Sequence, residues 1–233
     1  SMMGDGLSHV AFGVLALSVA LKKSPITFSL PVVILCAFFL LSISNKTKLR
    51  SDSAIALLST GSLAVGVMIL SVTTGMNTDV CNYLFGSILG MRVSDMYITI
   101  VVCSVIMVIY ACLYRKFFAV TFDENYATAL GLNVKLLNMF LAMICAVIIV
   151  LGMKMMGALL ISNLIVLPAI CAMTVLKSYK SVVIYSLILS VVTFSSGLFT
   201  SYLFSTPTGA SIVLINVFIF ALHFIVGKLG LIK

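Results

Sequence analysis

Charge is what this sequence has least of, since only 9% of its 233 residues are Asp, Glu, Lys or Arg. Soluble domains carry about a quarter. By contrast, 62% of the residues are hydrophobic. A water-soluble protein of this length could not bury so much apolar side chain, whereas a bilayer accommodates it because hydrocarbon replaces the need for a polar surface. The composition therefore predicts an integral membrane protein and argues against a soluble helical one.

Acidic residues are the scarcer charge, with 6 Asp and Glu against 14 Lys and Arg. In a soluble protein this excess would suggest a nucleic-acid partner. Here the basic residues fall between apolar runs, which is typical of loops anchored beside anionic lipid. We therefore expect a lipid bilayer and no nucleic acid as partner.

Three motifs are also missing. The six cysteines are irregularly spaced and none forms a CxxC pair, which argues against a disulfide framework or a thiolate metal cage. There is no GxxxxGK[ST] phosphate loop, so the chain cannot hydrolyse ATP by that route. There is no HExxH either, and an intramembrane metalloenzyme would need a third ligand and a base.

Long uncharged runs are abundant. About 20 residues at a rise of ~1.5 Å cross a ~30 Å hydrocarbon core. On this measure the sequence predicts an all-α polytopic transmembrane helical bundle, a single transmembrane domain over 1–233 with about eight spans. The spans lie near 6–21, 24–44, 53–74, 96–114, 136–153, 155–176, 181–204 and 210–227.

Three features lie between these runs. The apolar segment Asn82–Gly90 is too short to cross, and it is interpreted as a re-entrant or interfacial helix. Lys154, flanked by two glycines, is taken to separate the fifth and sixth spans in a tight hairpin. The cluster Thr206–Gly209 is a turn that divides the last two spans.

The basic loops predict orientation. Segments 46–50, 115–135 and 177–180 and the C-terminus are expected on the cytoplasmic side, and Lys22-Lys23 violates this rule.

Asp5 and His9 are the clearest ionisable pair within an apolar run. Their i, i+4 spacing places both side chains on one helical face. A carboxylate oxygen and an imidazole nitrogen suit zinc or manganese, and a site with few ligands permits release as well as binding. The alternative is that Asp5 caps the helix while His9 hydrogen-bonds a neighbouring helix.

Three further polar residues are interpreted as structural. His223, in the last span, is more typical of an interhelical hydrogen bond than of a metal ligand. Asn163 and Asn216 are expected to hydrogen-bond between helices.

The longest polar segment is 115–135. Within it, Asp123 precedes an Ala-rich stretch that ends at Gly131, which predicts a short capped helix. Such a helix could bind a soluble motor, and the alternative is an ordinary solvated loop.

Several segments in order then resemble the permeases of the zinc/manganese/iron family of ABC importers. They are Gly4-Asp5-Gly6-Leu7-Ser8-His9 (GDxLSH), Asp52-Ser53-Ala54-Ile55-Ala56, Tyr83-Leu84-Phe85-Gly86-Ser87-Ile88-Leu89, Val120–Leu132, Gly157–Ala169 and Thr206-Pro207-Thr208-Gly209-Ala210. The resemblance is closest to the zinc branch and runs from residue 4 to about residue 225.

The resemblance implies a homodimeric permease in the bacterial cytoplasmic membrane. Two copies of a cytoplasmic ATPase would hydrolyse ATP, and an extracytoplasmic metal-binding protein would deliver the ion. This chain would then be no enzyme and would hold no permanent cofactor, with zinc as its cargo. Manganese or iron, and a stand-alone secondary transporter or channel, are the alternatives.

The resemblance also implies roles for particular residues. Asp5 and His9 match the Asp and His on the family's translocation path. The residues matched to the ATPase-coupling helix are Phe122, Asp123, Glu124, Ala127, Ala129, Leu130 and Gly131. Two departures concern the start: Gly6 replaces the usual Ala, and relatives usually carry another helix before GDxLSH, so a first span ahead of residue 1 or a shortened chain is expected.

Overall fold

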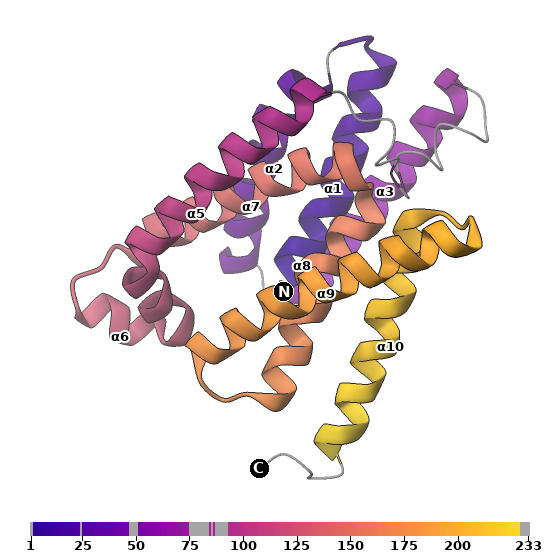
Figure 1. Cartoon of the computed structure of the whole chain (residues 1–233). Helices are drawn as coiled ribbons and strands as arrows, with labels where there is room; N and C mark the ends of the chain where they lie inside the picture. The colour runs from indigo at the N-terminus through magenta and orange to yellow at the C-terminus, as the bar shows by residue number, and fades with distance from the viewer. Residues whose placement is uncertain are drawn as a thin grey trace.

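The structure is a computed structural model, described here for residues 2–23, 25–46, 51–74, 84, 86 and 93–228. Within this part all regular secondary structure is helical, which confirms the all-α prediction (Figure 1). The helices are α1 (Met2–Ala20), α2 (Pro25–Lys46), α3 (Ser51–Thr74), α5 (Val93–Phe122), α6 (Glu124–Ala129), α7 (Val134–Met156), α8 (Ala158–Val175), α9 (Tyr179–Phe204) and α10 (Thr208–Lys228).

Each of the eight predicted spans overlaps one helix, and within the described residues α6 is a further, short helix. Among the described residues, six helices are long and apolar enough to cross a membrane, namely α3, α5, α7, α8, α9 and α10. The apolar stretches of α1 and α2 are shorter, at Gly4–Ala20 and Ile26–Ser42. Eight crossings therefore stay a prediction. Most of the predicted re-entrant segment 82–90 lies outside the described residues.

The first predicted boundary that the structure corrects is that of the loop 115–135. α5 continues to Phe122, so most of this segment is helical. The reason is a small apolar core at this end of the molecule, where Phe117 and Val120 of α5 pack with Ala127 of α6 and Leu137 of α7. Only the junctions around α6 are non-helical.

The second correction concerns Lys154. It does not separate two spans, because α7 continues through it to Met156 and breaks at Gly157, whose φ is +82°. The Lys154 ammonium lies 2.8 Å from the Asp95 carboxylate of α5. This ion pair compensates the charge at the end of an otherwise apolar helix. The tight hairpin itself is confirmed. A turn between α9 and α10 is confirmed too, but it ends at Pro207, because Thr208 and Gly209 already belong to α10.

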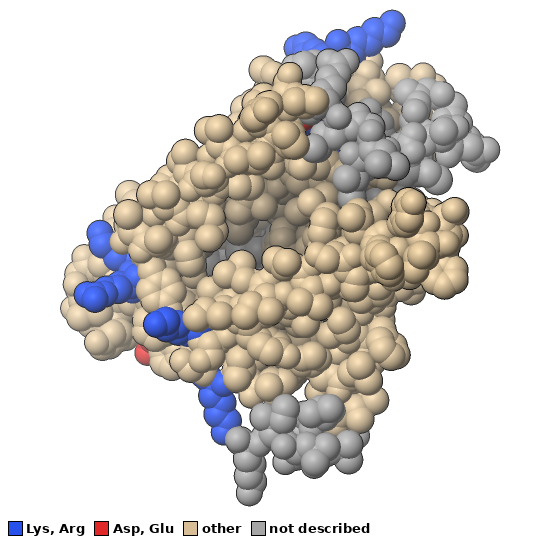
Figure 2. All heavy atoms as spheres, viewed as in Figure 1, with Lys and Arg blue, Asp and Glu red and all other residues tan. Residues whose placement is uncertain are grey.

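The outer surface is consistent with a membrane protein. Figure 2 shows Lys and Arg gathered at two opposite ends of this face, one of them over α6, with uncharged side chains between them. Large apolar side chains of α5 and α9, such as Val101 and Phe199, are more than half exposed. Such a surface fits hydrocarbon and not water.

Candidate functional site

The site begins with the position of α1, which is enclosed by α2, α3, α7 and α8 (Figure 1). Its Ala11, Phe12 and Ala16 are buried. α3 approaches closely at Gly13, where an added Cβ would lie 2.8 Å from the Ser62 carbonyl oxygen. Small residues allow such close packing of membrane helices. The N-terminal turns of α1 are thereby held inside the bundle.

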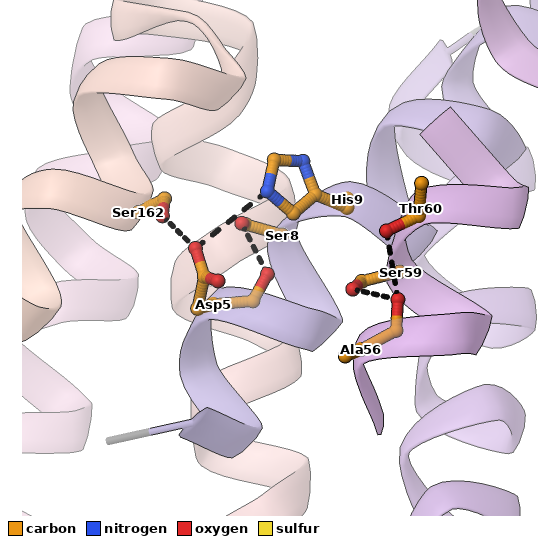
Figure 3. A network of polar contacts seen from close by, with 7 residues as sticks. All are labelled: Asp5, Ser8, His9, Ala56, Ser59, Thr60 and Ser162. Atoms are coloured by element: carbon orange, nitrogen blue, oxygen red, sulfur yellow. Dashed lines mark hydrogen bonds and ion pairs between the residues drawn. The ribbon is translucent and has the colours of Figure 1, made fainter. Parts of the chain in front are cut away.

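Asp5 and His9 lie on one face of α1, as their spacing predicts (Figure 3). Asp5 Oδ1 lies 3.6 Å from His9 Nε2, which is too long for a direct hydrogen bond. His9 Nδ1 is buried and has no hydrogen-bond partner in the described part of the chain. The expected alternative, in which His9 hydrogen-bonds a neighbouring helix, is therefore not what this geometry shows.

A third polar residue reaches the pair from another helix. Ser162 of α8 donates a hydrogen bond from Oγ to Asp5 Oδ1 (Figure 3). The neighbouring Ser8 hydroxyl instead donates to the Asp5 carbonyl within α1, at 2.7 Å. Sequence reasoning missed Ser162, because the hydroxyl of one serine in an apolar run gives no signal for a partner 157 residues away.

Asp5, His9 and Ser162 line a cavity of about 810 Å³ between α1, α3, α8 and α10. Most of its wall is apolar. The polar side chains that line it are Asp5, His9, Ser59, Thr60, Ser162 and Asn163. The hydroxyls of Ser59 and Thr60 donate to the Ala56 carbonyl of their own helix, at 2.9 Å and 2.8 Å (Figure 3). Asp5 and His9 are thus the ionisable groups of the cavity. A separate hollow of about 730 Å³ beside α9 and α10 has no His, Cys, Asp or Glu in its lining.

The described residues contain no cluster of three or more His, Cys, Asp or Glu able to hold a metal ion. Asp5 and His9 are one carboxylate and one imidazole, which is fewer groups than a closed metal site needs. Structural zinc sites are closed by four ligands. An open pair of donors suits an ion that must arrive and leave.

The polar residues interpreted as structural do bond between helices. The Tyr185 hydroxyl of α9 is hydrogen-bonded to His223 Nε2 of α10 at 2.7 Å. His223 Nδ1 lies 2.9 Å from the Ile219 carbonyl oxygen of its own helix. Asn216 Nδ2 of α10 donates to the side-chain Oδ1 of Asn163 of α8 at 2.8 Å. Both predictions are confirmed.

The second group of predicted residues forms the α6 corner, which we define as residues 122–131. Asp123 caps α6, because its carboxylate accepts from the backbone N–H groups of Asn125 and Tyr126 at 2.9 Å and 3.1 Å. Gly131, with φ +76°, ends the helix in the left-handed region that favours glycine. The predicted short capped helix is confirmed.

The α6 corner is fixed on one side and exposed on the other. Ala127 is fully buried against α5 and α7, and Glu124 accepts a 2.9 Å hydrogen bond from Asn138 of α7. By contrast, Phe122, Tyr126 and Leu130 are 80%, 60% and 57% exposed. Asp123, Ala129 and Gly131 are exposed as well. The α6 corner packs on α5 and α7 and shares no residue with the cavity lining.

The fold and the cavity together define a polytopic helical membrane protein with an ionisable pair in a cavity between its helices. Residues 1–227 match the ABC 3 transport family, and the chain belongs to that family. As a member, it is a multi-pass membrane protein.

Proteins named as subunits of metal transport systems align with most of this chain. The manganese transport system membrane protein MntC of Listeria monocytogenes is 28% identical over 97% of this chain and 80% of its own length. The high-affinity zinc uptake system membrane protein ZnuB of Haemophilus influenzae is 29% identical over 94% of this chain and 84% of its own. In the solved structure of PsaBC from Streptococcus pneumoniae in complex with Fab, one chain matches with a TM-score of 0.82 and 30% identity, covering 96% of this chain and 80% of that one.

Proposed function

We propose that this chain is the permease of an ATP-driven importer of divalent transition-metal ions. Zinc is its cargo, and Asp5 and His9 are ligands on the translocation path. Membership of the ABC 3 transport family, with relatives named for manganese and zinc systems, supports the transport of a metal ion. The proposal for the site depends on the geometry of the pair.

The single observation that carries the site assignment is the 3.6 Å separation of Asp5 Oδ1 and His9 Nε2. Zinc lies about 2.0–2.2 Å from nitrogen and oxygen ligands in tetrahedral sites, so two such ligands are separated by about 3.4 Å. The pair is therefore spaced to share one ion with little movement. Neither atom forms a hydrogen bond with the other that an ion would have to break.

The donor set suits either ion, and the spacing favours zinc over manganese. An octahedral ion places neighbouring ligands at right angles, at separations shorter than the tetrahedral value. A pair at the wider spacing is closer to the tetrahedral zinc case. The MntC and ZnuB relatives differ by a single percentage point, at 28% and 29% identity, so overall similarity does not separate the two ions.

Partners follow from the α6 corner and from the open site. A cytoplasmic ATP-binding-cassette subunit docks on Phe122, Tyr126 and Leu130, because these large side chains are 80%, 60% and 57% exposed and form an apolar surface that a partner can cover. ATP hydrolysis belongs to that subunit. A second permease copy forms the dimer, and an extracytoplasmic metal-binding protein delivers the ion.

The proposed mechanism is alternating access. Nucleotide-driven motion of the ATPase moves α6, and because Ala127 is buried against α5 and α7, those helices move with it. The two permeases then rock around the path. The ion passes Asp5 and His9 between the outward-open and inward-open states.

The experiment is reconstitution of the permease with its ATPase in vesicles, followed by element analysis of the accumulated ion. We expect ATP-dependent accumulation of zinc in preference to manganese. Uptake that needs no ATPase would overturn the importer assignment in favour of a stand-alone carrier. ATP-dependent uptake of manganese alone would overturn the choice of ion.

A further inference from the structure

We propose that Ser162 is a positioning residue for the metal site: its hydroxyl fixes the Asp5 carboxylate toward His9 and thereby raises the affinity of the pair for the ion. This inference rests on the proposed function of Asp5 and His9. It concerns a residue of α8, far from the GDxLSH segment in sequence.

The first step is the contact itself. Ser162 Oγ donates to Asp5 Oδ1, the same oxygen that lies 3.6 Å from His9 Nε2 (Figure 3). A carboxylate oxygen has two lone pairs. One can accept from the serine while the other stays directed at the ion. A hydrogen bond to an ionised acceptor is roughly twice as strong as a neutral one, so the serine restricts rotation of the carboxylate.

The second step is the anchoring of α8. Asn163 follows Ser162 directly, and successive residues of a helix point about 100° apart. Ser162 contacts α1, whereas Asn163 accepts the 2.8 Å hydrogen bond from Asn216 of α10. Asn216 is only 2% exposed. An unpaired amide in such an interior is costly, so this bond holds α8 at one rotation and depth. The Ser162 hydroxyl consequently has a fixed position.

The third step is the effect on the ion. Groups that hold a metal ligand in place keep the ligand in its binding orientation before the ion arrives, and their loss typically costs about 10- to 100-fold in affinity. The Asp5 side chain is 49% exposed to the cavity. Without Ser162 this carboxylate could turn into the cavity, away from His9.

Ser59 provides a matched control. It lines the same cavity and is 7% exposed, against 8% for Ser162. Its hydroxyl, however, bonds only to the Ala56 carbonyl of its own helix. Ser59→Ala therefore removes an equally buried hydroxyl from the same wall without touching Asp5.

The test is the dissociation constant for Zn²⁺ of the purified full-length protein, measured by competition with a fluorescent chelator. Ser162→Thr keeps a hydroxyl. Ser162→Val introduces a side chain of the same shape as threonine but without the hydroxyl. We expect Ser162→Val and Ser162→Ala to bind Zn²⁺ about 10-fold more weakly. Ser162→Thr should stay within about twofold of the unmodified protein, as should Ser59→Ala.

The outcomes separate this inference from the proposed function. If Asp5→Asn and His9→Ala lose Zn²⁺ affinity but Ser162→Ala and Ser162→Val do not, the inference on Ser162 is wrong and the site stands. If Asp5→Asn and His9→Ala keep their affinity, the proposed site itself is wrong. Equal weakening by Ser162→Thr and Ser162→Val would show a purely steric role and overturn the inference. Should Ser162→Val fail to fold, the comparison of Ser162→Ala with Ser59→Ala decides.

Discussion

The cavity at Asp5 and the α6 corner are both polar interruptions of an apolar chain, yet they are built in opposite ways. In the α6 corner the capping bonds join residues within three positions of each other. In the cavity, Asp5 is bonded to a serine 157 residues away. The first region is a local structure presented to the outside, whereas the second exists only once the helices have packed. The two are therefore separable by mutation.

The largest expected effect is at the cavity. Asp5→Ala and His9→Ala each remove one of the two proposed metal ligands. Loss of a group that only supports a ligand costs up to about 100-fold in affinity, so loss of a ligand should weaken Zn²⁺ binding by at least about 100-fold. Binding of the ATPase subunit should be unchanged, because neither residue contacts the α6 corner. Chelator competition and co-purification of the ATPase measure the two properties. Loss of ATPase binding in these variants would break the proposed separation.

The converse change is Leu130→Asp in the α6 corner. Leu130 is 57% exposed, so the permease should fold normally. A carboxylate placed in an apolar docking surface should weaken ATPase binding by about 30-fold, as expected for loss of a central interface residue. Zn²⁺ affinity should be retained. Co-purification together with chelator competition checks this, and an unimpaired complex would show that the ATPase docks elsewhere.

Acidification should weaken the binding of the metal ion in the cavity. Protons compete with the ion for the His9 imidazole and the Asp5 carboxylate, so metal affinity and transport should fall as the pH is lowered. Zn²⁺ titrations across a pH series provide the measurement, with His9→Ala as the control that should flatten the profile. A profile of unchanged steepness in that variant would exclude His9 as a ligand.

The smallest expected effect is on the Asp123 cap. Asp123→Ala leaves the first N–H groups of α6 without an acceptor, which typically costs about 1 kcal/mol of helix stability. Amide exchange of residues 124–130 should accelerate by roughly fivefold. Asp123→Asn keeps an acceptor and serves as the matched control. Equal exchange in the alanine and asparagine variants would mean that the cap does not stabilise α6.

The same comparison explains what the sequence could predict. The α6 helix was predictable from Asp123 and Gly131, because capping and left-handed termination depend on neighbouring residues. The pair Asp5 and His9 was predictable because one helical turn relates them. Ser162 was not, since its role depends on how α8 packs beside α1. The two wrong boundaries also depend on contacts between helices. α5 continues to Phe122 because its end packs against α6 and α7, and Lys154 of α7 pairs with Asp95 of α5.

X-ray absorption at the zinc edge of the Zn²⁺-loaded full-length protein would show directly whether His9 is a ligand of the ion. We expect a four-coordinate ion with nitrogen and oxygen ligands at about 2.0–2.2 Å, including the scattering signature of imidazole. That signature should disappear in His9→Ala. A first shell containing sulfur at about 2.3 Å, or a spectrum unchanged by His9→Ala, would contradict the proposed site.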